Sequence, residues 1–123
     1  MRLPDWENKL NDYIASVKDR KFRYGRFDSV LFTFGAVKAI TGEDKIGGLR
    51  WANRKEADAI LAEKPLDERL AEIFEECPPA FARRGDVAFY EGACGVVVGR
   101  YALFCGDNWK AIPITQLERA FHA

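Results

Sequence analysis

The feature that most constrains this fold is an apolar segment that begins at Asp28 and ends at Gly42. Its large apolar side chains fall on nearly every face of a helix: Val30, Leu31, Phe32, Phe34, Val37 and Ile40. A helix that is apolar all round must be covered by other elements, so the segment predicts a buried central helix. Asp28 suits its N-cap and Gly42 a left-handed C-cap. As an N-cap, Asp28 should stabilise the protein by about 1 kcal/mol relative to alanine.

Three more helices are predicted in the first part of the chain. Apolar residues at helical spacing, with a proline in the first turn, predict one over residues 4–18. Asn53 opens a capping-box pattern and predicts a second over residues 54–64. Pro65 ends that helix and starts a third over residues 66–76, which the prolines after Cys77 terminate.

After residue 84 the apolar period changes from that of a helix to that of a strand. The stretches VAFYE, CGVVVG, RYALFC and KAIPI predict short strands with turns between them, and hence an antiparallel meander. A second capping box at Thr115–Glu118 predicts a short C-terminal helix that reaches Phe121. Helices followed by strands predict an α+β fold, in which the helices pack on the meander as one domain over residues 1–123.

Composition narrows the classes of function. Of the 123 residues, 48% are hydrophobic and 31% charged, which is typical of a globular domain. The 19 basic and 19 acidic residues cancel, so we expect no nucleic-acid partner and no membrane partner. No apolar run approaches the roughly 18 residues of a membrane span, and the first ten residues lack a signal-peptide core. We therefore expect a cytoplasmic protein or part of an assembly built in the cytoplasm.

The cysteines predict neither a metal site nor a disulfide framework. Cys77, Cys94 and Cys105 show no C-x-x-C spacing, and His122 is the single histidine. Because zinc sites and disulfide frameworks show regular spacings, we expect buried reduced thiols, no metal and no cofactor.

The Asp28–Ser29 pair at the start of the central helix permits two interpretations. Both residue types are favoured N-caps and stabilise a helix without any chemistry. Ser29 also stands where a nucleophile would benefit, because the free backbone N–H groups of a helix N-terminus can stabilise an oxyanion. A serine nucleophile needs a base within hydrogen-bond reach, normally a histidine held by a third polar group.

The surrounding motifs favour a particular family. The pattern F-x-Y-G-x-x-D-S-x-x-F, followed later by RRGDVAFYEGACGVVVGRYALF, resembles the papain-like, NlpC-type cell-wall amidohydrolases. It is most similar to small phage and prophage relatives of these enzymes, which share the opening LPDWE and the Gly85-Asp86 step before the first core strand. The resemblance runs from Arg2 to the C-terminus and implies a papain-like fold.

Departures from the family pattern imply that the catalytic chemistry is lost. The family nucleophile is a cysteine after the aspartate, and here that position is Ser29. The family base is a histidine before the second core strand, and the matching residue is Ala93. The phage relatives often carry a histidine before the Asp-Cys pair, where this chain has Phe27. The alternative is a peptidoglycan amide or peptide hydrolase in which Ser29 or Cys94 attacks, with Asp28 or Asp86 as an unusual base.

The resemblance implies a structural or assembly role in a phage or prophage tail, near the tail tip or baseplate, with other tail proteins as partners. The protein would then reside in the host cytoplasm during assembly and later in the virion tail. The former cleft, around Tyr24, Asp28, Ser29 and Trp51, would have become a packing or binding surface. Trp51 and Trp109 fall in predicted loops, either as exposed aromatic anchors or as core residues. A further alternative is a phage protein that binds a host protein.

Overall fold

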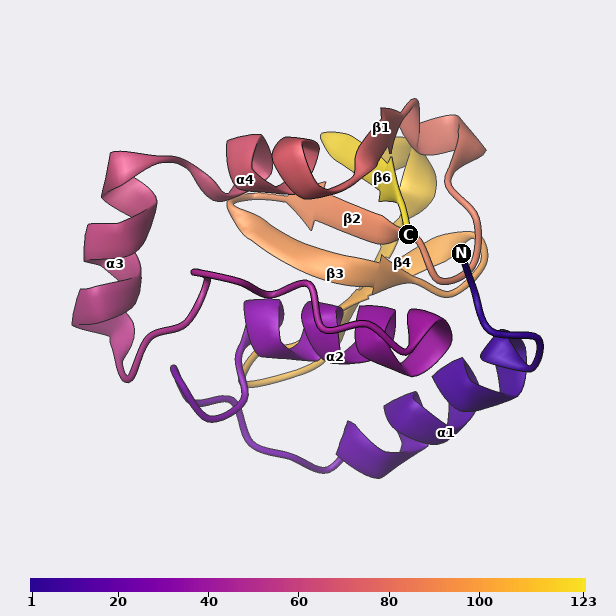
Figure 1. The fold of residues 1–123 in the computed structure, drawn as a ribbon, viewed down its shortest axis with the longest axis horizontal. Helices are drawn as coiled ribbons and strands as arrows, with labels where there is room; N and C mark the ends of the chain where they lie inside the picture. The colour runs from indigo at the N-terminus through magenta and orange to yellow at the C-terminus, as the bar shows by residue number, and fades with distance from the viewer.

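Helix α2 (Ser29–Thr41) lies at the centre of the computed structural model, which describes residues 1–123 (Figure 1). Asp28 caps its N-terminus, where the backbone N–H of Leu31 donates to Asp28 Oδ1 at 2.9 Å. Gly42 ends it at a φ of +78°, a left-handed conformation that glycine adopts without strain. Both predicted caps are confirmed, and the helix is buried between α1 on one side and the sheet on the other.

The other helices lie close to their predicted places. Helix α1 (Trp6–Val17) packs against α2, and the Tyr13 ring lies over Gly35, where no side chain stands in its way. Helix α3 (Arg54–Glu63) starts at Asn53, whose side-chain oxygen accepts a hydrogen bond from the Glu56 N–H at 3.0 Å. Helix α4 (Leu66–Ile73) follows Pro65 directly.

The second half of the chain forms the antiparallel sheet that the sequence predicts. Its strands run in the order β1-β6-β2-β3-β4-β5, and every pair of neighbours is antiparallel. The four predicted strands are all present: β2 (Val87–Tyr90), β3 (Ala93–Val97), β4 (Tyr101–Phe104) and β5 (Lys110–Pro113). The fold is therefore α+β, with α2 packed on the sheet at β3.

Two predictions of secondary structure are wrong at the other edge of the sheet. The helix expected over residues 66–76 ends at Ile73, and Glu75–Cys77 forms strand β1. The expected C-terminal helix is instead a 3-10 turn, η2 (Ile114–Gln116), followed by strand β6 (Arg119–His122). A further 3-10 turn, η1 (Pro79–Phe81), follows β1 and lies beside η2.

Strand β6 replaces the expected helix because it is inserted between β1 and β2. Ala120 and Phe121 are neighbours in sequence and both are completely buried, on opposite faces of the sheet. A short surface helix would expose one face of this segment, whereas a strand inside a sheet buries both faces and pairs its backbone on both sides. Glu118, from the supposed capping box, instead accepts a hydrogen bond from the Glu91 N–H.

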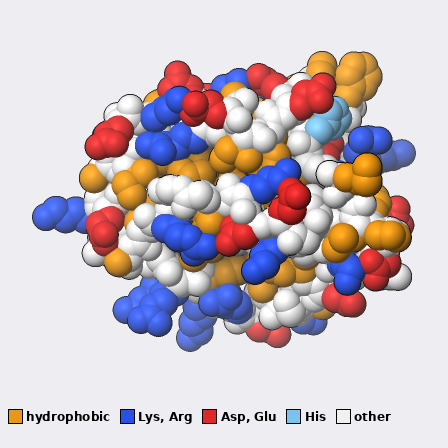
Figure 2. All heavy atoms as spheres, viewed as in Figure 1, with side chains coloured by type: hydrophobic (Ala, Val, Ile, Leu, Met, Phe, Trp, Pro, Cys, Tyr) orange, Lys and Arg blue, Asp and Glu red, His pale blue; other side chains and the backbone are white.

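The largest apolar cluster lies between the sheet, α2 and α4 and includes Phe34, Leu70, Phe74, Val87 and Phe121. On the surface, acidic and basic side chains are interspersed over the face seen in Figure 2, with apolar patches between them. None of the helices has the length and apolar character needed to cross a bilayer.

Candidate functional site

The Asp28 carboxylate is buried and fully engaged by hydrogen-bond donors. Oδ1 accepts from the Leu31 N–H at 2.9 Å, and Oδ2 accepts from the Gly25 N–H at 3.0 Å and from Trp51 Nε1 at 2.9 Å. Only 1% of the residue is exposed. The carboxylate therefore fastens the 25–28 turn and the Trp51 loop to the start of α2, and it is not directed at Ser29 as a base.

Ser29 occupies the first turn of α2, as expected for the family's nucleophile position, and is half-buried. Its carbonyl oxygen accepts a hydrogen bond from Cys94 Sγ at 3.4 Å. The single histidine, His122, hydrogen-bonds to Asp86 instead, at the opposite end of the sheet from the start of α2 (Figure 1). The structure thus brings no basic side chain to the Ser29 hydroxyl.

Cys94 lies directly behind Ser29 but is unsuited to attack a substrate. It is completely buried, and this burial raises the pKa of its thiol to about 12. At neutral pH the thiol is therefore protonated, whereas the thiolate is the nucleophilic form. The neighbouring Thr33 hydroxyl is also buried and lies beside the Cys94 thiol, but it forms no hydrogen bond of good geometry.

Apolar side chains occupy the two positions that the sequence resemblance matches to histidines. Ala93 begins β3 and packs against the apolar cluster that contains Ala88, Val97 and Phe104. Phe27 is 2% exposed and packs on Phe32, with ring centroids 6.1 Å apart. Neither position offers a proton acceptor to Ser29.

The residues of the expected former cleft form a closed structure. Asp28 and Trp51 line a cavity of only about 40 Å³. Tyr24 lies apart from them, with its ring edge-on to Phe22 at 5.0 Å. A cavity of this size admits about one water molecule and no substrate.

The interpretation of Trp51 and Trp109 as exposed anchors is wrong, and their alternative role in packing is confirmed. Trp109 packs edge-on against Phe32, with centroids 4.9 Å apart, and its Nε1 donates to the Lys18 carbonyl at 2.8 Å. Trp51 is likewise half-buried and directs its Nε1 inward to Asp28. Both indole N–H groups therefore donate hydrogen bonds within the protein and are not available to a partner.

A larger cavity, of about 470 Å³, opens beside β3, β4 and β5. Ala93 lines it together with Tyr90, Phe104 and Cys105. Burial raises the pKa of the Cys105 thiol to about 12, so this thiol is also protonated at neutral pH. The cavity is lined by both apolar and polar residues, and sequence motifs did not indicate it.

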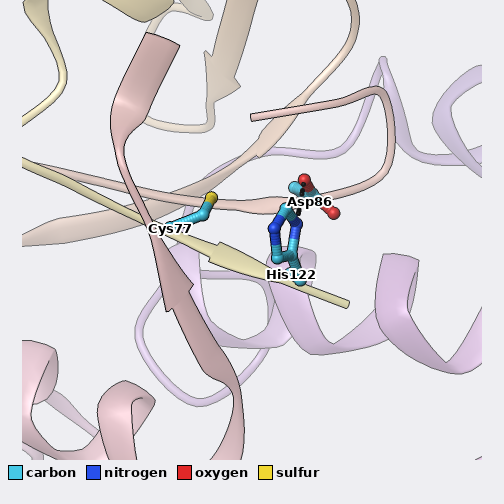
Figure 3. A group of neighbouring side chains, drawn as sticks. All are labelled: Cys77, Asp86 and His122. Atoms are coloured by element: carbon cyan, nitrogen blue, oxygen red, sulfur yellow. Dashed lines mark hydrogen bonds and ion pairs between the residues drawn. The ribbon is translucent and has the colours of Figure 1, made fainter. Parts of the chain in front are cut away.

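A second polar cluster joins Cys77, Asp86 and His122 near the two ends of the chain (Figure 3). One ligand atom from each residue lies within 4.8 Å of the other two. Asp86 is completely buried; Oδ1 accepts from Arg2 and the Ala123 N–H, and Oδ2 from the Arg83 N–H and His122 Nδ1. The sequence spacing of the cysteines and His122 did not indicate this grouping, which includes Cys77.

Sequence reasoning missed this cluster because its members are far apart in the chain. The sequence suggested Asp86 as a turn residue before β2 or as an unusual base, and the structure confirms the turn with a hydrogen bond from the Asp86 N–H to the Arg83 carbonyl. The β1–β6 and β6–β2 pairings then bring the three side chains together. Burial, reinforced by the Asp86 and Glu76 carboxylates, raises the pKa of the Cys77 thiol.

These features define an α+β domain with a closed helix-capping site at Asp28 and a separate Cys-Asp-His cluster at the sheet edge. The chain belongs to the family described as Domain of unknown function (DUF6950), whose family model matches residues 1–123. No curated protein and no solved structure matches the chain. The geometry and the motifs therefore supply the arguments about function.

Proposed function

We propose that this protein is a non-catalytic papain-like domain that acts through protein–protein contacts as a structural or assembly component of a phage or prophage tail, near the tip or baseplate. The proposal that the domain is non-catalytic rests on the hydrogen bonding of Asp28 and the surroundings of Ser29. Three N–H donors engage the Asp28 carboxylate, and no base reaches the Ser29 hydroxyl. The tail assignment rests on the resemblance of the LPDWE, Asp-Ser and Gly-Asp motifs to small phage proteins.

Hydrolysis at this site would need a proton acceptor that the surroundings do not offer. A serine hydroxyl is essentially un-ionised at neutral pH and attacks only when a neighbouring base takes its proton. The positions that match the family's histidines carry Ala93 and Phe27, and the Cys94 thiol behind Ser29 is buried and protonated. The motifs that shape the fold are present, and the groups that perform proton transfer are absent.

Two exposed aromatic residues mark the surface where we place the partner. Phe81 and Tyr101 are 69% and 51% exposed, unlike Trp51 and Trp109. Phe81 belongs to η1, which lies beside η2, and the Ile114 N–H of η2 donates to the carbonyl of Arg100, next to Tyr101. Both residues therefore belong to segments next to η2, where a tail protein would gain buried aromatic area.

The first experiment measures hydrolysis of purified peptidoglycan and its stem peptides by the wild-type protein and by Ser29→Ala. We expect no turnover by either, with an active NlpC-type amidohydrolase as the positive control. Turnover that disappears in Ser29→Ala would contradict the proposal and establish a hydrolase. Turnover lost in Cys94→Ala alone would contradict it equally, with the nucleophile on β3.

The second experiment tests the tail role. Mass spectrometry of purified particles, and capture by the tagged protein from phage-producing and phage-free lysates, should recover the same tail protein. Capture should weaken at least tenfold in the Phe81→Ser, Tyr101→Ser double variant and remain unchanged in Trp109→Phe, which keeps an aromatic ring and removes only the N–H that donates to the Lys18 carbonyl. Capture of a single host protein from both lysates, with no tail protein, would replace the tail role with host binding.

A further inference from the structure

The pairing of β1, β6 and β2 places four possible metal ligands on one face of the sheet. Residues directly opposite in an antiparallel pair share a face, and alternate residues of a strand share a face. His122 lies opposite Glu75, and Cys77 stands two residues from Glu75 on the same strand. The β2–β6 register, with Val87 opposite Phe121, brings Asp86 beside His122 from the other side.

The orientation of the His122 ring is fixed by this arrangement. Its Nδ1 lies 3.0 Å from Asp86 Oδ2, so that nitrogen carries the hydrogen and the other ring nitrogen keeps its lone pair. Figure 3 shows the imidazole between the two partners, with the second nitrogen on the side of the Cys77 sulfur. In metal sites, a carboxylate commonly accepts a hydrogen bond from one ring nitrogen of a ligating histidine and so orients the other nitrogen toward the metal.

We propose that Cys77 and His122 bind a divalent transition-metal ion of the zinc class, that Asp86 orients the imidazole, and that Glu75 supplies a third ligand. The thiolate, imidazole and carboxylate of this set are the groups that zinc accepts in four-coordinate sites, and water completes the coordination. Ligand atoms around such an ion lie about 3–4 Å apart. The atoms of Cys77, Asp86 and His122 already lie within 4.8 Å of one another, so small side-chain rotations suffice.

The charges around the cluster favour a cation over a reactive thiolate. Cys77 is 6% exposed, and the carboxylates of Asp86 and Glu75 lie on its own face of the sheet, where the Arg83 guanidinium offsets their negative charges only in part. These negative charges disfavour a free thiolate. Nucleophilic cysteines usually lie in electropositive surroundings, and Cys77 does not. The same charges attract a divalent ion, which deprotonates the thiol on binding and releases one proton to solvent.

Three further features suit the cluster to binding an ion. Asp86 balances its charge through Oδ1, which lies 2.8 Å from the Arg2 guanidinium, while Oδ2 faces His122. The His122 side chain is 33% exposed, so solvent and metal reach the cluster from outside. Glu75 forms no ion pair with another residue, and its exposed side chain is free to turn toward His122.

The test uses the full chain, reduced and treated with chelator, with Zn²⁺ titrated by calorimetry and Co²⁺ as a spectroscopic probe. We expect one ion per chain and a thiolate-to-cobalt charge-transfer band. Cys77→Ser should abolish the band, and His122→Ala should weaken Zn²⁺ binding at least tenfold. Cys105→Ser, which removes a half-buried thiol elsewhere, should change neither readout.

A carboxylate pair on β1 gives a matched control that leaves the core untouched. Glu75→Gln should weaken Zn²⁺ binding several-fold, whereas Glu76→Gln, on the opposite face and paired with Arg119, should leave it unchanged. Absence of a cobalt band in the wild-type protein, or equal losses in the two glutamine variants, would overturn the proposal. If Cys77→Ser does not fold, the Cys94→Ala, Cys105→Ser variant decides the question: a retained band supports Cys77 as ligand, and a lost band refutes it.

Discussion

Replacing Asp28 by alanine should destabilise the protein by about 3 kcal/mol. The substitution leaves three N–H donors without an acceptor: those of Gly25, Leu31 and the Trp51 indole. Each buried, unsatisfied donor costs about 1 kcal/mol or more. The sum exceeds the loss of about 1 kcal/mol expected when Asp28 is regarded only as an N-cap.

The assay is urea unfolding, followed by far-ultraviolet circular dichroism and tryptophan fluorescence, on the wild type and two alanine variants. Asn53→Ala is the matched control, because Asn53 caps α3 with a single hydrogen bond from Glu56 and is exposed. We expect it to cost about 1 kcal/mol. Equal losses in Asp28→Ala and Asn53→Ala would refute the reasoning, since water would then have replaced the lost carboxylate.

Three further variants test the core around α2. Thr33→Val should stabilise the protein by about 1 kcal/mol, because it removes a buried hydroxyl without a partner; a lower urea midpoint would contradict this. Because the folded state raises the pKa of Cys94 to about 12, the unfolded chain loses this proton first as pH rises above about 9. Stability should therefore fall between about pH 9 and 12, by up to about 1.4 kcal/mol per pH unit, and less steeply in Cys94→Ala; equal slopes would argue against it. Gly35→Ala should lower the Tm despite a gain of about 1 kcal/mol in helix propensity, because the new Cβ would lie 2.7 Å from Tyr13 Cζ. Tyr13→Leu should relieve part of that loss in the double variant, and an unchanged Tm in Gly35→Ala would show that the ring moves freely.

The elements that local sequence determines were predicted correctly. Helix α2 is one, because its caps and its apolar surface lie within a single segment from Asp28 to Gly42. The strands from Val87 to Pro113 are another, because each is a short, mainly apolar run that ends at a turn. The errors at Glu75–Cys77 and Arg119–His122 fall where two distant segments pair, and local capping signals carry no information about such pairing.

The same distinction between local and long-range determinants applies to the two candidate sites. The cap role of Asp28 follows from its place before an apolar helix, but its bond to Trp51 depends on how a loop folds back over α2. The side chains of Cys77, Asp86 and His122 meet through the register of three strands. The sequence alone does not specify that register. The capping-box pattern directly before the strand that carries His122 even predicts a helix there.

Asp86 has a consequence for how this protein folds. Its buried carboxylate is neutralised by Arg2 near one end of the chain and accepts a hydrogen bond from Ala123 at the other. The charge is therefore left uncompensated until a segment of 84 residues has closed into a loop, and Arg2 also donates through Nε to the Ala123 carbonyl, 121 residues away in the chain. The N-terminal arm and strand β6 should consequently gain and lose protection from hydrogen exchange together, since loosening either end exposes the same carboxylate.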